Sequence, residues 1–365
     1  MSFKISEIKA LMKKYERWVL PVALLVGFIV DNLTLTRVDK WFDNIILFWY
    51  IVLASTGILI LYAKRTTFTV KPWFVKLKVF TPLIVQYAFG GLFSGLVIFY
   101  FRSGSIFTSF PFLIVLFLLF LANDYLHGKY QRLTFQLVIF YVALFSYFTL
   151  VTPIITREIS VWIFLLGTAI SIIVMYFYLK ILAKVIPEED YIKNKNTIEK
   201  TILATASIFV ILYFINVIPP IPLSMKDGVI ARNVTVSPEK IYSVTVEKPS
   251  WWQIGRDFNK TIHHKKGEPI YAFSSVFAPT KITGTIYHEW SRFDPSKNRW
   301  VESDRIPINI IGGRDGGSRG FSFKGQVQDG LWRVNIESES GQVIGRFTFK
   351  ISSEATNNEL EVLEY

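Results

Sequence analysis

The chain of 365 residues contains no cysteine. Without thiols it can form no disulfide, no thiolate metal site and no cysteine nucleophile. Histidine is scarce as well, with four in the chain. His263 and His264 are adjacent and His288 is distant, and none of the three is four residues from another, which is not the spacing of a metal site. The sequence therefore predicts no metal and no cofactor.

Familiar catalytic motifs are missing too. The sequence has no G-x-S-x-G elbow of a serine hydrolase and no H-E-x-x-H motif of a zinc peptidase. Glu289, Asp294, Asp304 and Asp315 could provide a pair of carboxylates for hydrolysis only if the fold brought two of them together. No catalytic residue is predicted.

Acidic residues are scarce in one part of the chain only. Residues 1–222 hold 21 Lys and Arg against 11 Asp and Glu, whereas residues 223–365 hold 19 against 17. The net charge of +12 therefore comes mainly from the N-terminal part, where membrane topology explains it better than nucleic-acid binding does. No nucleic-acid partner is predicted.

Hydrophobic residues are abundant, at 51%, because the N-terminal part contains long apolar runs. A helix needs about 20 residues to cross the hydrocarbon of a bilayer. The runs predict about seven spans, at 18–30, 41–62, 80–101, 106–123, 133–152, 159–182 and 202–217. The first run is short and follows a basic segment, so six spans remain the alternative. The "DNLTLTRVDK" that follows it lacks the small-residue site of a cleaved signal peptide.

The positions of the basic residues predict the orientation. With the N-terminus inside, the segments between spans place seventeen Lys and Arg in the cytoplasm and four outside. Basic residues are retained on the cytoplasmic side during insertion. The N-terminus is therefore predicted to be cytoplasmic, and seven spans place the C-terminal part outside.

Charged groups are few within the spans. Asp31, Asp43 and Lys180 lie near span ends, which suits anchoring at the interface, and no proton relay can be drawn. Gln86 and Gln136 lie mid-span and are expected to hydrogen-bond between helices. Close helix packing is predicted where Gly91 and Gly95 have the small-xxx-small spacing.

A different pattern begins after Ile218. Short runs of β-branched and aromatic residues, separated by Gly, Pro, Asn and Asp, are typical of strands. They lie at 229–236, 240–247, 269–277, 281–290, 305–311, 319–325, 331–338 and 342–350. The predicted fold is thus an α-helical membrane bundle followed by an all-β, immunoglobulin-like sandwich, with a small barrel as the alternative for the β part. The domains are a basic amphipathic segment at 1–17, a transmembrane domain at 18–222 and a β domain at 223–365.

The β domain resembles a known family. The segments "YHEWSRFD", "GGRDGGSRGFS", "GLWRVNIES" and "GQVIGRFTF", with Trp300, resemble a bacterial family called domain of unknown function 2914, most strongly over residues 271–351. The earlier "GFIVDNLTLTRVD" is similar to the first span of multi-spanning proteins that carry this domain. The resemblance implies a sandwich in the cell envelope, and it implies no activity and no catalytic residues.

Two segments are candidate binding sites. The loop "GGRDGGSRGFS" at 312–322 lacks the Lys-Ser/Thr pair of a phosphate-binding loop, and its glycines suit a tight turn between strands. Its Arg314, Asp315 and Arg319 remain candidates for a polar contact. In the segment 250–269, Trp251 and Trp252 lie near a basic cluster and suit a glycan, a lipid headgroup or a protein. They could equally anchor the domain on the membrane or fill its core.

These observations predict an integral protein of the bacterial cytoplasmic membrane, in contact with the lipid bilayer. It is predicted to be non-enzymatic and to present an outer β domain to an envelope protein, a glycan or a lipid headgroup. The alternative is a multi-spanning transporter or a membrane-embedded transferase with an accessory outer domain. The sparse charges within the spans favour the first function. The oligomeric state stays open.

Overall fold

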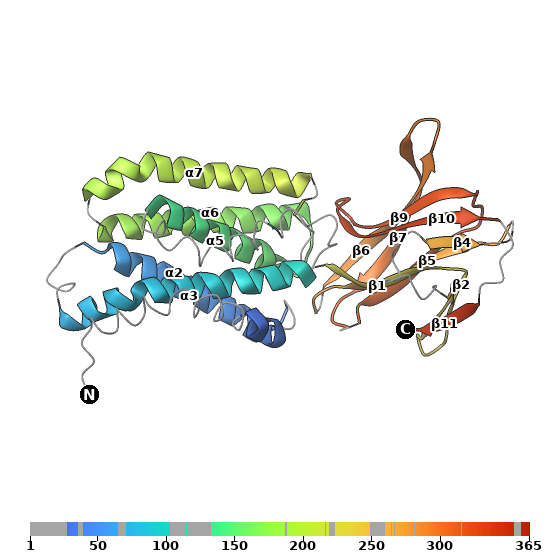
Figure 1. Ribbon diagram of the computed structural model, residues 1–365, viewed down its shortest axis with the longest axis horizontal. Coiled ribbons are helices and arrows are strands. Elements are labelled where there is room, and N and C mark those ends of the chain that lie inside the picture. Colours follow the sequence, from blue (N-terminus) through green and yellow to red (C-terminus); the bar gives the residue numbers. More distant parts are fainter. Residues whose placement is uncertain are drawn as a thin grey trace, which may run out of the picture. The chain divides into compact units, whose positions relative to one another are not determined.

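The computed structural model describes residues 28–35, 39–64, 71–102, 114, 133–186, 188–215, 217–218, 223–248, 260–263, 265, 267–280, 282–314, 316–353 and 359–365. The chain forms two compact units, a helical one and a β-rich one whose main part begins at Ile218 (Figure 1). The predicted segment 1–17 and most of the apolar runs 18–30 and 106–123 lie outside the described residues.

Five helices of the described residues are long and apolar enough to cross a membrane, as a membrane protein requires. The helices are α2 (Trp41–Tyr62), α3 (Pro72–Arg102), α5 (Leu133–Thr156), α6 (Val161–Val185) and α7 (Glu188–Phe214). Two of them begin well before their apolar runs. Proline suits the first position of a helix, where α3 has Pro72.

Close packing and tyrosine hydroxyls join the helices. A Cβ on Gly91 would lie 2.5 Å from the ring of Tyr50, and α2 and α3 therefore approach each other closely here. Tyr100 of α3 lies 3.0 Å from the hydroxyl of Thr149 on α5. Tyr178 of α6 donates a hydrogen bond of 2.9 Å to the Ser55 carbonyl of α2. The close approach predicted from the glycines is thus made within this chain.

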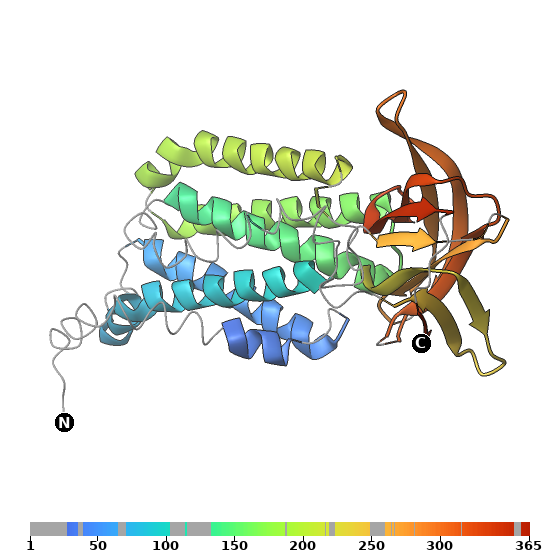
Figure 2. The same cartoon turned by 45° about the vertical axis from the view of Figure 1, so that its right-hand side comes forward.

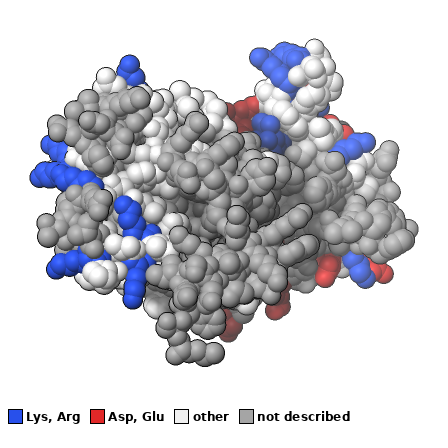
Figure 3. Space-filling model, turned by 60° about the vertical axis from the view of Figure 1, so that its left-hand side comes forward, with Lys and Arg blue, Asp and Glu red and all other residues white. Residues whose placement is uncertain are grey.

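Basic residues gather at one end of the helical unit. The Lys64 amide donates to the Val185 carbonyl over 2.8 Å, and the Lys78 ammonium to the Ala63 carbonyl over 3.3 Å. These bonds bring together the end of α2, the end of α6 and the start of α3. The cations along these segments are Lys64, Lys71, Lys76, Lys78 and Lys184. In Figure 3, Lys and Arg side chains gather on the left of the view.

The β-rich unit contains three sheets in the part that the structure describes. The strands are β1 (Ser224–Ala231), β2 (Asn233–Val236), β3 (Tyr242–Glu247), β4 (Lys260–His263), β5 (Ile270–Phe277), β6 (Thr283–Asp294), β7 (Arg299–Ile311), β8 (Ser318–Lys324), β9 (Gly330–Ser338), β10 (Val343–Ser352) and β11 (Leu360–Glu364). Their orders are β1-β5-β8, β4-β10-β9-β6-β7 and β11-β3-β2. Neighbouring strands are antiparallel except for β4 and β10, which are parallel. The β6–β7 hairpin protrudes beyond its neighbours (Figures 1 and 2).

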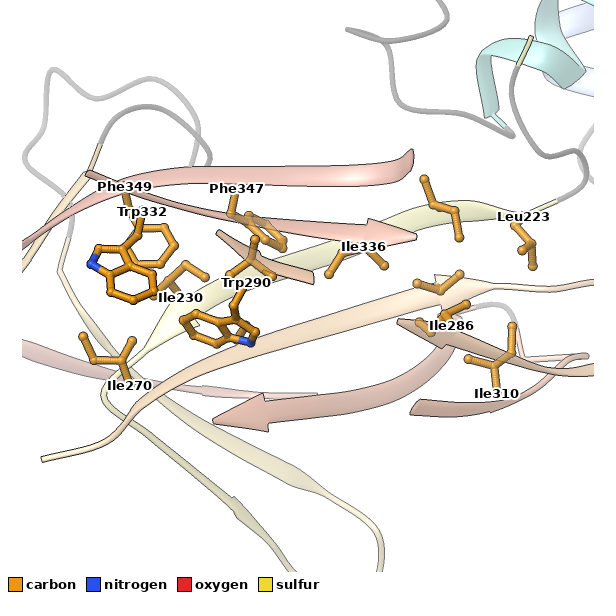
Figure 4. Packing of buried hydrophobic residues seen from close by; sticks show 14 of the residues in the cluster. Leu223, Ile230, Ile270, Ile286, Trp290, Ile310, Trp332, Ile336, Phe347 and Phe349 are labelled. Atoms are coloured by element: carbon orange, nitrogen blue, oxygen red, sulfur yellow. The ribbon is translucent and has the colours of Figure 1, made fainter. Parts of the chain in front are cut away.

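The sheet β1-β5-β8 packs on both of its faces. Ala272 and Val276 of β5 belong to the larger core, shared with the five-stranded sheet and centred on Trp290, Trp332 and Phe347 (Figure 4). Phe273 points to the opposite face and joins a second core with strands β2 and β3. A strand covered on both faces has no polar alternation. This explains why β5 reads as an almost continuous apolar segment.

The strands predicted from sequence largely agree with the structure. All eight predicted segments contain strands, although the first is divided at Arg232 into β1 and β2. Strands β4 and β11 were not predicted, since they have only four and five residues and few β-branched or aromatic ones. The three sheets of the described residues differ from the two of an immunoglobulin-like sandwich, because a further sheet covers the Phe273 side of the middle one.

Candidate functional site

The glycine loop between β7 and β8 is held by backbone hydrogen bonds. The amide of Gly312 donates to the Ile282 carbonyl over 2.8 Å, and that of Gly313 to the Ala278 carbonyl over 3.0 Å. The Gly317 amide donates to the Arg314 carbonyl over 3.1 Å. A phosphate-binding loop needs free amides pointing at the ligand. Since these three amides already have partners within the chain, the loop serves as a structural connection.

The structure describes two of the five predicted candidates, Arg314 and Arg319. Arg314 is exposed on the loop, while Arg319 is half-buried on β8 with its guanidinium 3.7 Å from the position of a Cβ on Gly316. The Arg319 carbonyl accepts a hydrogen bond of 3.3 Å from the Tyr242 hydroxyl. Trp251, Trp252 and Asp315 lie outside the described residues.

A polar cluster lies on a different surface, the face of the five-stranded sheet that points away from the larger core. We call it the outer face. Side chains of a strand alternate between the two faces of its sheet. In β9 the alternation places Trp332, Val334 and Ile336 in the core, so Arg333 and Asn335 point outward.

Strand pairing arranges the outer-face residues in rows across four strands. In one row Arg346 of β10 pairs with Asn335 of β9, which pairs with Glu289 of β6, which pairs with Arg305 of β7. The next row contains Thr348, Arg333, Ser291 and Glu302 in the same strand order. Glu337 lies opposite Tyr287 in a third row. Residues far apart in sequence thus meet on one surface.

Glu289 and Asn335 form a buried layer beneath the charged groups. Their exposed fractions are 8% and 4%, too small for either to be the main contact of a ligand. Asn335 donates from Nδ2 to Glu289 Oε2 over 2.5 Å and to Glu337 Oε1 over 3.3 Å. The Ser291 hydroxyl donates to the other carboxylate oxygen of Glu289. A buried carboxylate needs such partners, and here they hold Glu289 in a single position.

The two carboxyl groups of the cluster are in hydrogen-bond contact. Burial, together with the charge of the neighbouring Glu289 and the hydrogen bond to it, raises the pKa of Glu337 to about 7. Carboxyl groups of glycosidases stand about 5 Å or more apart to flank the scissile bond. Because Glu289 and Glu337 are in hydrogen-bond contact, this pair does not have the geometry of a glycosidase pair.

Three arginines form the accessible layer of the outer face, and two of them stack on aromatic rings. Arg305 Cζ lies 3.8 Å from the ring centroid of Tyr287, and Arg333 Cζ lies 4.6 Å from that of Trp300. Arg305 Nε is also 3.8 Å from Glu337 Oε2. Stacked guanidinium groups lose little rotamer freedom on binding because the ring already orients them. The outer face therefore presents oriented donors beside aromatic surface.

A second polar cluster is closed to ligands. His288 is fully buried, and its ring nitrogens hydrogen-bond to Ser274 over 2.8 Å and to Ser322 over 2.9 Å. Trp290 Nε1 also donates to the Ser322 hydroxyl, over 2.9 Å. Burial lowers the pKa of His288 to about 3, so the ring is neutral. This serine–histidine contact joins β6 to β5 and β8 in the core and reaches no surface.

Sequence reasoning named Glu289 but missed its partners. It offered Glu289, Asp294, Asp304 and Asp315 as a group from which the fold could bring two together, whereas the structure brings Glu289 into contact with Glu337. The alternation in "WRVNIES" places Arg333, Asn335 and Glu337 at every second position, and this signal indicates one polar face. The register with β6 and β10, which completes the cluster, is a tertiary property.

The outer face belongs to the part of the chain that matches a known family. The family described as "Protein of unknown function (DUF2914)" matches residues 283–351, from the start of β6 into β10. The match confirms the resemblance seen in the sequence for this region. No curated protein matches the chain.

Solved structures are similar to the chain only weakly. A β-glucosidase from Listeria innocua in complex with gluconolactone matches 31% of this chain at 14% identity, with a TM-score of 0.19. The match spans 16% of the length of that glucosidase. The alkylpurine DNA glycosylase AlkC of Pseudomonas fluorescens, bound to DNA containing an abasic site analog, matches 87% of this chain and 100% of its own at 9% identity, with a TM-score of 0.22. Similarities this weak carry no argument about function.

Proposed function

We propose that this is a multi-spanning protein of the bacterial cytoplasmic membrane whose β domain binds an envelope glycan through the outer face, without catalysis. Seven spans are proposed, the described five with the runs at 18–30 and 106–123. The gathering of lysines at one end of the helical unit supports a cytoplasmic position for that end. The opposite end, from which the chain enters the β domain, is then extracytoplasmic.

The mixed chemistry of the outer face is the observation that carries the glycan assignment. Sugars present hydroxyls that donate and accept hydrogen bonds, and C–H faces that pack on aromatic rings. Arg305 and Arg346 supply exposed donors, Glu337 supplies a half-buried acceptor, and Tyr287 supplies a half-buried ring. The buried Glu289 and Asn335 hold this layer in place, as a preorganised binding site requires.

Glycan binding is tested with the full-length protein in nanodiscs of zwitterionic lipid, on an array of neutral and acidic oligosaccharides. We expect a defined subset to bind, and Tyr287→Ala to weaken that binding several-fold because the ring packs against the sugar and orients Arg305. The matched control is Phe323→Ala, which removes an aromatic ring that is 58% exposed on β8. Loss of binding in both variants, or binding to a protein or to anionic vesicles without any oligosaccharide, contradicts the glycan assignment.

A further inference from the structure

Arg333 stands out on the outer face because no carboxylate of the described residues forms an ion pair with it, although Glu289 and Glu337 lie near enough to favour its charge. Its guanidinium stacks on Trp300, and its Nε is buried without a hydrogen bond to any described residue. The buried Nε itself is out of a ligand's reach, so donation to a ligand would come from the terminal nitrogens of this half-buried side chain. The stacking on Trp300 orients these terminal donors.

The carboxylates of the cluster are engaged with other groups. Ser291 and Asn335 occupy both oxygens of Glu289, and Glu337 accepts from Asn335 and lies beside Arg305. Arg346 donates from Nε to Asn335 Oδ1 over 2.7 Å, which leaves the rest of its exposed guanidinium accessible. Arg305, Arg333 and Arg346 thus share the outer face with Glu289, Glu337 and the exposed Glu302. Among the described residues, neither Arg333 nor Arg346 forms an ion pair with these carboxylates, whereas Arg305 lies beside Glu337.

The two arginines without a carboxylate contact are neighbours. Arg346 pairs with Asn335, two residues along β9 from Arg333, so their side chains are diagonal neighbours on the sheet. Burial lowers the pKa of Arg333, and repulsion from Arg346 lowers it further. A guanidinium stays charged despite such a shift. Two adjacent cations that repel each other form a site whose energy falls when an anion binds between them.

We propose that Arg333 and Arg346 form an oxyanion subsite, which binds a carboxylate or phosphate group of an acidic ligand on the outer face. This rests on the proposed function and specifies it, since the glycan then carries acidic groups. The planar forks of the two guanidiniums match the oxygens of a carboxylate or a phosphate in bidentate geometry. Trp300 holds the fork of Arg333 in place before the ligand arrives.

The subsite is tested by calorimetric titration of the full-length protein in zwitterionic nanodiscs with three probes: glucuronate, inorganic phosphate and glucose. We expect glucuronate, phosphate or both to bind, and glucose to bind at least about tenfold more weakly, since a charge-assisted hydrogen bond exceeds a neutral one by about that factor. Stronger binding of glucuronate assigns the acidic group as a carboxylate, and stronger binding of phosphate assigns it as a phosphate.

Variants locate the subsite. Arg333→Gln and Arg346→Gln are each expected to weaken the binding of the acidic probe about tenfold. Arg333→Lys keeps the charge but loses the fork and the stacking, and it should also bind more weakly than the wild type. Arg314→Gln removes an exposed arginine of the β7–β8 loop and should bind like the wild type. Hydrogen exchange of β9 peptides, unchanged in Arg333→Lys, shows that the sheet is intact.

The outcomes separate this inference from the proposed function. One outcome is phosphate binding that depends on Arg333 while no oligosaccharide binds on the array. It supports the oxyanion subsite and contradicts the proposal that the ligand is a glycan. Another outcome is that neutral oligosaccharides bind and that Arg333→Gln and Arg346→Gln leave this binding unchanged. It supports the glycan assignment and overturns the oxyanion subsite. The subsite is also overturned if no acidic probe binds, or if Arg314→Gln weakens binding as much as Arg333→Gln does.

Discussion

Single residues of the β7–β8 loop are constrained by backbone conformation and by close contacts, and the two constraints fall on different glycines. Gly313 and Gly317 have φ angles of +102° and +82°, which L-residues with a side chain rarely adopt. Gly312 has no such angle, but a Cβ there would lie 1.9 Å from the Pro279 carbonyl oxygen. At Gly316 a Cβ would meet only the end of the Arg319 side chain, at 3.7 Å.

The first prediction compares two neighbouring glycines. Gly317→Val should destabilise the β domain by about 1 kcal/mol or more, because it combines a strained φ with contacts below 3 Å to Ser275 and Val276. Gly316→Val should change stability little. Thermal unfolding of the full-length variants in detergent measures both. Equal destabilisation by the two substitutions would be inconsistent with this loop geometry.

The second prediction concerns two titrating residues whose effects on stability oppose each other. The pKa of His288 is about 3 in the folded state and 6.5 when unfolded. As the pH falls below about 6.5, the unfolded state gains a proton that the folded state does not, so stability decreases towards pH 3. Glu337 has a pKa of about 7 when folded and 4.5 when unfolded. Its contribution is therefore fully present below pH 4.5 and is lost as the pH rises through 7.

Between pH 4.5 and 6.5 the two slopes have opposite signs, and single variants should reveal each of them. In Glu337→Gln only the titration of His288 remains, so the stability of the β domain should rise with pH over this range. In His288→Gln only the titration of Glu337 remains, so the stability of the β domain should fall as the pH rises. Hydrogen exchange of β6 and β9 peptides across this range gives the local stability. Identical pH profiles in the two variants would show that His288 and Glu337 do not control how the local stability depends on pH.

At the scale of elements, β5 links the two cores of the β domain. Alternate residues of this strand contribute to opposite cores, with Ala272 and Val276 on one side and Phe273 on the other. Phe273 is fully buried, and its ring centroid lies 4.5 Å from that of Tyr365 and 5.7 Å from that of Tyr242. The sheet β11-β3-β2 therefore depends on the Phe273 face of the middle sheet.

The third prediction tests this dependence. Phe273→Ala should destabilise the β domain by about 3–5 kcal/mol, since it removes a buried ring and leaves a cavity. Hydrogen exchange should increase in β3 and β11 more than in β9, which belongs to the other core. The control is Phe323→Ala on the neighbouring strand β8, where the ring is 58% exposed and should contribute little. A uniform increase in the rate of hydrogen exchange across all strands would contradict the existence of two separable cores.

At the scale of the whole molecule, the distribution of charge distinguishes the two parts of the chain. Residues 1–222 contain 21 Lys and Arg against 11 Asp and Glu, a clear excess of positive charge. Several described lysines of this part lie near the C-terminal ends of α2 and α6. Residues 223–365 are nearly balanced, with 19 Lys and Arg against 17 Asp and Glu. This asymmetry is the basis of the proposed orientation in the membrane.

The fourth prediction concerns that orientation. Reporter fusions after Lys200 and after Tyr365 should lie on opposite sides of the membrane, with the first in the cytoplasm. A reporter active only in the cytoplasm, paired with one active only outside it, distinguishes the two positions. The same side for both fusions would rule out a single crossing by α7 and with it the proposed orientation.

The sequence by itself determined the types of the elements. Apolar runs longer than a bilayer crossing indicated helices such as α2 and α5, and alternating β-branched residues indicated β1 to β3 and β5 to β10, because these patterns depend only on local periodicity. The same periodicity puts Arg333, Asn335 and Glu337 on one face of a strand, although the sequence analysis did not single them out. Only the tertiary structure decided which strands lie beside that face. The register of β6, β9 and β10 brings Glu289, Asn335 and Arg346 into one row, and covering both faces of β5 produces a third sheet. Such pairings join residues distant in sequence, and local periodicity holds no information about them.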